Sequence, residues 1–193
     1  MSRPRDSTVE EKVYEATLSL VVSQGYSRLR IDDIATTSHV AKTTIYRRWA
    51  SVSALVLDAL ASAIGPREHA ETGDPLQDLS ALLDVMYATV ATGPLAQTVR
   101  AVGADLIHQP DLAADYRRRF VNPLRDRAIS LVTQGQRERT FTPGIDPALV
   151  VDALIGPVIY RGLIHEPMPA RDDLFALALR MLATTPTVIS VQQ

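Results

Sequence analysis

Residues 28–50 contain two short amphipathic segments separated by a tight turn, and this pattern constrains the fold more than any other stretch. Over residues 31–38, Ile31, Ile34 and Ala35 recur at the i, i+3 and i+4 spacing of one helical face. Over residues 42–49, Ile45 and Trp49 form a second inner face. The segment between them is too short for anything but a turn. The spacing therefore predicts a helix-turn-helix unit.

The outer face of the second helix carries only basic and hydrogen-bonding side chains. Cations suit phosphates, whereas hydroxyls and a guanidinium suit base edges in a major groove. Short helix pairs with a few arginines also occur in proteins that never touch DNA, so spacing alone leaves both alternatives open. If the segment binds DNA, we expect Thr44, Tyr46 and Arg47 to read bases. The full set of candidate DNA-binding residues is Arg30, Lys42, Thr43, Thr44, Tyr46, Arg47 and Arg48.

This stretch resembles the TetR/AcrR family of transcriptional regulators. The family pattern combines a Gly, Asp-Ile-Ala, a turn ending in Val-Ser, and a Thr-hydrophobic-Tyr-x-x-aromatic helix. The corresponding residues of this chain are Gly25, Asp33-Ile34-Ala35, Val40-Ala41 and Thr44-Ile45-Tyr46-Arg47-Arg48-Trp49. The resemblance covers about residues 8–65 at the level of motifs, and beyond them it rests on size and helical pattern.

Two positions depart from the family pattern. The residue before the first helix of the pair is usually Thr or Ser, whereas here it is Arg30, which cannot cap a helix but can reach a phosphate. The Ser-Lys pair expected after the second helix is Ser51-Val52, so one phosphate contact is missing. Each lost contact lowers the salt dependence of DNA binding by roughly one unit of slope.

Charge is distributed unevenly along the chain. The net charge is −2, which by itself does not suit a DNA-binding protein. Residues 1–50, however, contain eight Lys and Arg against six Asp and Glu, and the remainder is acidic. A basic face on an acidic body concentrates DNA affinity at one place.

Composition argues against several other classes of protein. The chain has no cysteine, which excludes disulfides, thiolate metal sites and cysteine nucleophiles. The histidines show no metal-binding spacing, and no nucleophile, phosphate-loop or dinucleotide motif is present. We therefore expect no enzyme and no cofactor. No apolar run of about 20 residues and no signal-peptide core is found, so we expect a cytoplasmic protein with no membrane partner.

All segments of useful length have helical rather than alternating periodicity, which predicts an all-α fold. We expect a three-helix DNA-binding helix-turn-helix domain at residues 1–50, a connecting helix at 51–65, and a helical ligand-binding and dimerisation domain at 66–193. The polar loop at 65–75 is the expected boundary. Pro123 predicts a break in the helix that starts near Pro110.

Two C-terminal helices are expected to form a dimer. Residues 148–164 are apolar nearly all round, and residues 170–182 add a second apolar helix. A helix that is apolar on every side must be buried on every side, and a four-helix bundle between two chains would achieve this. The resemblance implies the same homodimer. The alternative is a pair of core helices in a monomer.

The resemblance also implies a small-molecule effector bound inside the C-terminal domain. Such a pocket is expected to be mostly apolar with a few polar groups. Arg100 and His108 are the polar candidates, although Arg100 could instead pair with Asp84 or Asp105. The candidate ligand-binding residues are Met86, Tyr87, Val90, Arg100, Ala104, His108, Tyr116, Phe120, Leu124, Leu154 and Tyr160.

The run Arg117-Arg118-Arg119 invites a second nucleic-acid site. Three consecutive residues point in different directions around a helix, so we expect a solvated surface instead, with Asp111 and Asp115 as partners.

Taken together, these features predict a ligand-responsive transcriptional regulator. We expect a repressor that binds double-stranded DNA at a palindrome as a dimer and is released by a small-molecule inducer. The alternative is an all-helical interaction module with weak or vestigial DNA binding, which the departure at Val52 keeps open.

Overall fold

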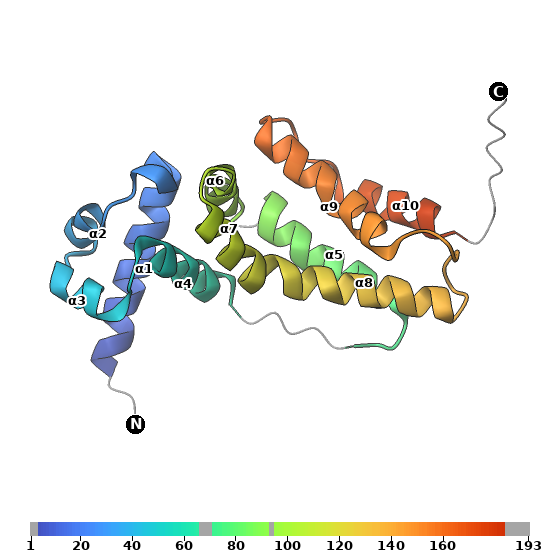
Figure 1. Ribbon diagram of the computed structural model, residues 1–193, viewed down its shortest axis with the longest axis horizontal. Coiled ribbons are helices and arrows are strands. Elements are labelled where there is room, and N and C mark those ends of the chain that lie inside the picture. The colour runs from blue at the N-terminus through green and yellow to red at the C-terminus, as the bar shows by residue number, and fades with distance from the viewer. Residues whose placement is uncertain (1–3, 66–70, 93–94, 184–193) are drawn as a thin grey trace. The chain divides into compact units, whose positions relative to one another are not determined.

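The computed structural model describes residues 4–65, 71–92 and 95–183 (Figure 1). Every regular element within these ranges is a helix, which confirms the all-α prediction. In chain order they are α1 (Pro4–Gln24), the 3-10 turn η1 (Tyr26–Arg28), α2 (Ile31–Ser38), α3 (Lys42–Arg48), α4 (Val52–Ile64), α5 (Pro75–Tyr87), the π-helical η2 (Ala88–Thr92), α6 (Ala96–Leu106), α7 (Pro110–Tyr116), the π-helical η3 (Arg117–Val121), α8 (Asn122–Arg137), α9 (Pro147–Leu163) and α10 (Arg171–Leu182).

The helices form two compact units. The N-terminal unit contains α1 to α4, α6, α7 and the first residues of η3, up to Arg119. The C-terminal unit contains α5, the first residues of η2, and the chain from Phe120 through α8, α9 and α10. The compact units therefore differ from the functional domains expected at 1–50 and 66–193, because α6 and α7 pack with the N-terminal helices.

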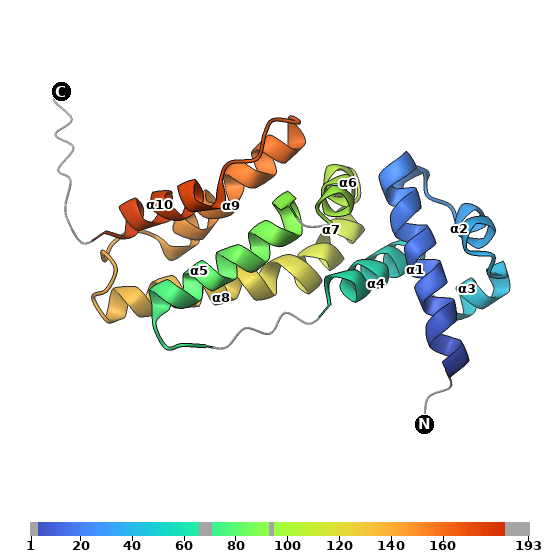
Figure 2. The same cartoon turned by 180° about the vertical axis from the view of Figure 1, so that it is seen from behind.

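Helix α1 is the centre of the N-terminal unit. It lies between the α2–α3 pair and α4 (Figures 1 and 2). Its inner face consists of Val13, Ala16, Thr17 and Val21, and the Thr17 hydroxyl donates to the Val13 carbonyl oxygen at 2.7 Å. The helix begins at Pro4, since proline suits the first turn of a helix.

Side-chain caps define where several helices begin. Ser51 caps α4 by accepting from the Ala54 amide at 3.1 Å, and Asp146 caps α9 by accepting from the Ala148 amide at 2.9 Å. Ser and Asp are favoured at this position because their side-chain oxygens accept from the first free amides of a helix. Near Pro123 the α-helical pattern is interrupted rather than ended: α7 ends at Tyr116, the π-helical η3 follows directly, and Pro123 lies in the first turn of α8. The sequence would place Pro94 in the first turn of the helix that contains α6, but this residue lies outside the described residues.

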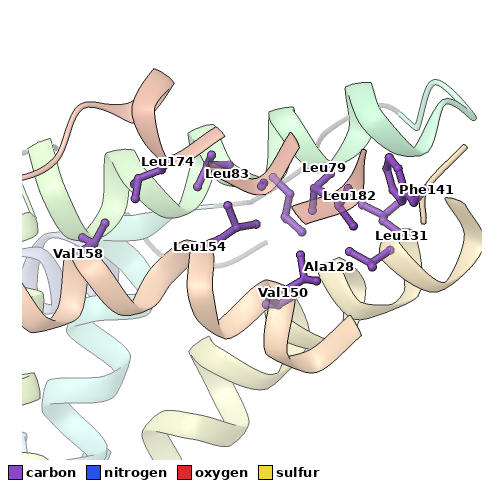
Figure 3. Packing of buried hydrophobic residues seen from close by; sticks show 14 residues of the cluster. Leu79, Leu83, Ala128, Leu131, Phe141, Val150, Leu154, Val158, Leu174 and Leu182 are labelled. Atoms are coloured by element: carbon purple, nitrogen blue, oxygen red, sulfur yellow. The ribbon is translucent and has the colours of Figure 1, made fainter. Parts of the chain in front are cut away.

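The C-terminal unit buries one apolar core between α5, α8, α9 and α10 (Figure 3). Leu79 and Leu83 come from α5, Leu131 from α8, and Leu154 from α9. The remaining labelled members are Ala128, Phe141, Val150, Val158, Leu174 and Leu182. Burial of this set removes apolar surface from water at about 25 cal/mol per Å², which stabilises the unit.

Two polar contacts hold the ends of this core. Arg171 of α10 donates through Nε to the Asp84 carboxylate of α5 at 2.6 Å, and its guanidinium lies 4.9 Å from the Phe175 ring centroid. The buried Asp78 carboxylate accepts from the amide and the hydroxyl of Thr72, at 2.9 and 2.8 Å. These hydrogen bonds hold the pKa of Asp78 below its ordinary value, because they favour the charged form.

Of the described helices, none is by itself both long and apolar enough to cross a membrane, whereas the bent pair Pro75–Thr92 and Ala96–Leu106 meets that requirement by length and composition alone.

We predict that Gly135→Ala destabilises the protein. A Cβ at this position on α8 would lie 2.1 Å from the Phe141 ring, which is itself buried, so the ring or the helix must move. We expect the free energy of unfolding to fall by about 1–3 kcal/mol in denaturant titrations. Gly103→Ala on α6 is the matched control, because its Cβ meets no atom within 4 Å and should stabilise the helix by about 0.5–1 kcal/mol. Equal effects of the two changes would contradict the close packing of Gly135 on Phe141.

Candidate nucleic-acid interface

The turn between α2 and α3 is closed by a left-handed residue. His39 has φ 56°, and the Val40 amide donates to the Ala35 carbonyl oxygen at 3.2 Å. This backbone geometry ends α2 and lets α3 start at Lys42. The structure thus confirms the helix-turn-helix arrangement predicted over residues 28–50.

Helix α3 has seven residues and one buried side. Ile45 is 0% exposed, and Trp49, which follows the last helical residue, is 4% exposed. The opposite side is open to solvent, and Tyr46 is 61% exposed. The other candidate DNA-binding residues on this side are the exposed Lys42, Thr43 and Arg47 and the partly buried Thr44. The structure therefore brings basic, hydroxyl and aromatic groups together on one accessible face.

Two of the candidate cations form ion pairs. Lys42 lies 2.7 Å from the Asp32 carboxylate, with both side chains more than half exposed, so it remains accessible to a phosphate. The Arg48 side chain is only 18% exposed and pairs with Glu10 of α1. We expected Arg48 to contact phosphate, but this ion pair favours a role in holding α3 against α1.

Trp49 connects the end of α3 to two other helices. Its ring packs edge-on against Tyr14 of α1, with centroids 5.7 Å apart. Its indole Nε1–H donates to Oδ2 of Asp58 on α4 at 3.1 Å. Burial raises the pKa of the Tyr14 hydroxyl, and the Asp58 and Glu10 carboxylates raise it further because they disfavour a second negative charge nearby. The hydroxyl therefore stays neutral at ordinary pH.

Asp105 of α6 fixes the residues that come just before α2. Arg30 is the residue before α2, is exposed, and makes no side-chain cap, as the sequence predicts. Asp105 of α6 accepts from the Tyr26 amide at 3.0 Å and from the Ser27 hydroxyl at 2.5 Å. Burial is the main cause that raises the pKa of Tyr26, and the Asp105 carboxylate adds to it.

Sequence reasoning missed the residues that support this interface. Glu10, Tyr14, Asp58 and Asp105 come from three helices and carry no local motif. For the run Arg117-Arg118-Arg119, the predicted partner Asp115 is confirmed for Arg118, which lies 2.7 Å from it. The adjacent Arg119 instead pairs with Asp58 at 2.7 Å, which no spacing along the chain indicates.

The candidate ligand-binding residues fall in both compact units. In the C-terminal unit, Leu154 is part of the core, Met86, Tyr87, Val90 and Leu124 pack against it, and Phe120 is buried. The Tyr87 hydroxyl donates to the Pro169 carbonyl oxygen at 2.7 Å, whereas Tyr160 is 63% exposed. The candidates in the N-terminal unit are the partly buried Arg100 and Tyr116 and the exposed Ala104 and His108.

A small cavity lies in the core of the C-terminal unit. Its volume is about 10 Å³, close to what a single water molecule requires. Two of the candidates, Met86 and Leu154, are in its lining. The complete lining is Leu79, Leu82, Leu83, Met86, Ala128, Val151 and Leu154, all apolar. The cavity therefore offers no charged or hydrogen-bonding side chain to a ligand.

Within the described ranges, no group of three or more His, Asp or Glu side chains is arranged to hold a metal ion.

We predict that Arg48 and Arg47 have different effects on stability. Arg48→Ala removes the ion pair that holds α3 to α1, so the free energy of unfolding should fall by about 1 kcal/mol. Arg47→Ala, at an exposed position of the same turn, should change it by less than about 0.5 kcal/mol. Urea titrations followed by circular dichroism measure both, and Glu10→Gln should reproduce the loss seen with Arg48→Ala. The pairing would be unimportant if Arg48→Ala and Glu10→Gln both matched Arg47→Ala.

Two family models match the chain. The model described as bacterial regulatory proteins of the tetR family matches residues 13–59, which include α2 and α3. The model described as the tetracyclin repressor-like C-terminal domain matches residues 69–182. Together they span nearly all of the described structure.

Related proteins agree with these matches. The HTH-type transcriptional regulator YdeS of Bacillus subtilis is 30% identical over 84% of this chain and 82% of its own length. A transcriptional repressor named TetR from Mycobacteroides abscessus is 31% identical over 56% of this chain and 52% of its own length. The crystal structure of the TetR family regulator SCO0332 superposes with a TM-score of 0.63 at 26% identity, over 92% of this chain and 98% of that one. NalD of Pseudomonas aeruginosa, at 16% identity, shares the fold with a TM-score of 0.67 over 93% and 98%. The chain therefore belongs to the TetR family of DNA-binding transcriptional regulators.

Proposed function

We propose that this protein is a ligand-responsive repressor that binds a palindromic operator as a homodimer. The observation that carries the proposal is the division of α3 into a buried side and an exposed basic side. Repression is typical of the family, and the Mycobacteroides abscessus relative is named as a repressor. In this role the protein acts on DNA in the cytoplasm without a cofactor.

In the proposed complex, the outer side of α3 enters the major groove. Thr44, Tyr46 and Arg47 contact bases, because a guanidinium can form two hydrogen bonds to guanine and hydroxyls can contact several base edges. Lys42, Thr43 and Arg30 contact phosphates around them. Arg48 contributes indirectly, because its ion pair with Glu10 fixes the orientation of α3.

The proposed dimer forms through residues 148–164 and 170–182. Val150, Val151, Leu154 and Val158 of α9 are buried in the chain's own core. Its opposite side is exposed and mostly apolar, with Asp152 as its charged residue, which pairs with Arg125 at 3.0 Å, and α10 exposes further leucines. The large exposed apolar residues of this surface are Leu149, Ile159, Tyr160, Leu163, Ile164, Leu177 and Leu179. A second copy would cover this surface in a four-helix bundle, and it would bring two copies of α3 to half-sites one helical turn apart.

The proposed effector is a small, largely apolar molecule that binds in the core of the C-terminal unit, next to Met86 and Leu154. An all-apolar lining cannot stabilise a charged group, so binding there selects for an uncharged ligand. Ligand pockets usually have volumes of roughly 300–1,000 Å³, whereas this cavity is about 10 Å³. Binding therefore requires a second arrangement of the helices, in which the ligand has its higher affinity.

We predict that Arg47→Ala reduces sequence selectivity. The test is salt-dependent binding to the DNA that flanks the protein's own gene, compared with unrelated DNA of the same length. We expect a loss of roughly 1–3 kcal/mol on the preferred sequence and a smaller loss on unrelated DNA. Lys42→Ala should weaken binding to both, and it should lower the salt slope by roughly one.

Arg137→Ala is the matched control for these variants, because Arg137 is exposed in the last turn of α8 in the other compact unit. It should leave both affinity and selectivity unchanged. Weak binding that is indifferent to DNA sequence and to Arg47→Ala would instead support the alternative of an interaction module with vestigial DNA binding.

We predict that Leu149→Asp converts the dimer to a monomer. Leu149 is 62% exposed, so the chain's own core should tolerate the change, whereas a buried carboxylate would destabilise a dimer interface. Sedimentation velocity should show the mass falling by half. Ile107→Asp is the matched control, because Ile107 is 74% exposed in the other unit and should leave the mass unchanged. A wild-type protein that sediments as a monomer would contradict the proposed dimer.

A further inference from the structure

The Asp58 carboxylate accepts hydrogen bonds from two segments that are far apart in the sequence. Its Oδ2 accepts from the Trp49 indole at 3.1 Å, and its Oδ1 accepts from the Arg119 guanidinium at 2.7 Å. All three residues belong to the N-terminal unit. One side chain therefore connects the end of α3 with the π-helical segment η3.

Arg119 occupies a special position along the chain. It is the last residue of the N-terminal unit, and the next residue, Phe120, is buried and belongs to the C-terminal unit. Both lie in η3, so any rotation of that turn that moves Phe120 also moves Arg119. The chain also passes between the units after Ala91, inside the second π-helical segment, η2. Single π-helical turns within helices are frequent at functional sites.

Trp49 links the position of the recognition helix α3 to the ion pair between Asp58 and Arg119. Trp49 is the residue that ends α3, and α3 is too short to keep its position without tertiary contacts. On the α4 side, the Trp49 indole donates to Asp58. Loss of Arg119 leaves the Asp58 carboxylate free to turn towards water, because both partners are about one-third exposed.

We propose that Arg119 is a positioning residue for DNA binding: through Asp58 it holds Trp49, and with it α3, in the orientation that fits DNA. This inference rests on the proposed function, because it concerns the residues that hold the proposed recognition helix. The side chains involved do not themselves touch DNA.

The first test follows Trp49 directly, since it is the only tryptophan in the chain. Indole emission responds to a charge and a hydrogen bond at Nε1. We expect Arg119→Ala and Asp58→Asn to shift the emission maximum and to increase quenching by acrylamide. Arg118→Ala is the matched control, because Arg118 pairs with Asp115 on the same segment and should change neither property. Arg119→Lys, which can still pair with Asp58, should restore the wild-type signal.

The second test measures affinity for a duplex that the wild-type protein selects from a random-sequence library. We expect Arg119→Ala and Asp58→Asn each to lower affinity by roughly two- to thirty-fold. The salt slope should stay unchanged, whereas loss of a direct phosphate contact would lower it by roughly one. Asp58→Asn is decisive, because removal of a negative charge by itself would increase affinity for DNA. Arg119→Lys should bind like the wild type.

The outcomes separate this inference from the proposed function. A wild-type protein that selects no duplex refutes the proposed function, and the fluorescence series then still decides whether Arg119 holds Trp49. A wild type that selects a duplex, together with an Asp58→Asn variant that binds it as well or better, overturns the inference. An Arg119→Ala variant that matches Arg118→Ala in both tests also overturns it. Circular dichroism melting verifies that each variant is folded, and Arg119→Gln replaces Arg119→Ala if the latter is not.

Discussion

Burial of Trp49 is the interaction on which the proposed DNA-binding surface depends. Helix α3 has only seven residues, and isolated helices shorter than about 12–15 residues are marginal in water. Its position must therefore come from contacts with other helices, and Ile45 and Trp49 supply the apolar part of them. The Glu10–Arg48 ion pair and the Asp58–Trp49 hydrogen bond fix the rotation of the helix about its axis. Because Ile45 and Trp49 anchor one side of α3 in the core, the opposite side, with Tyr46, stays exposed to solvent.

Helices α6 and α7 belong to the N-terminal unit, and residues of this part of the chain support the helix-turn-helix pair. Asp105 of α6 holds the residues before α2, and Arg119, after α7, holds Asp58 of α4. The DNA-binding helices therefore do not form an isolated three-helix domain but share a compact unit with a segment from the middle of the chain. The chain passes from that segment into the C-terminal unit after Arg119.

The C-terminal unit shows a different division of apolar residues. Helix α9 buries Val150, Leu154 and Val158 in its own core, yet Leu149 and Tyr160 on another side remain exposed. The sequence of α9, which is apolar nearly all round, thus forms one face buried in the chain's own core and another face exposed to solvent. The core itself is closely packed, since Phe141 lies directly against the backbone of Gly135 and the internal cavity is about 10 Å³. Such a core has little free space, so a ligand can enter only if helices separate.

The sequence by itself determined the local structure: the all-α class, the helix-turn-helix pair, and an interruption of the α-helical pattern near Pro123. These signals depend on residues a few positions apart in the chain, so they can be read without the fold. The motifs of the helix-turn-helix pair also determined the family. Only the tertiary structure decided which residues hold α3, and that Arg119 pairs with Asp58 rather than with Asp111 or Asp115. Apart from the Trp49–Asp58 hydrogen bond, those contacts join side chains tens of residues apart, and no periodicity or capping pattern along the chain encodes which helix faces meet.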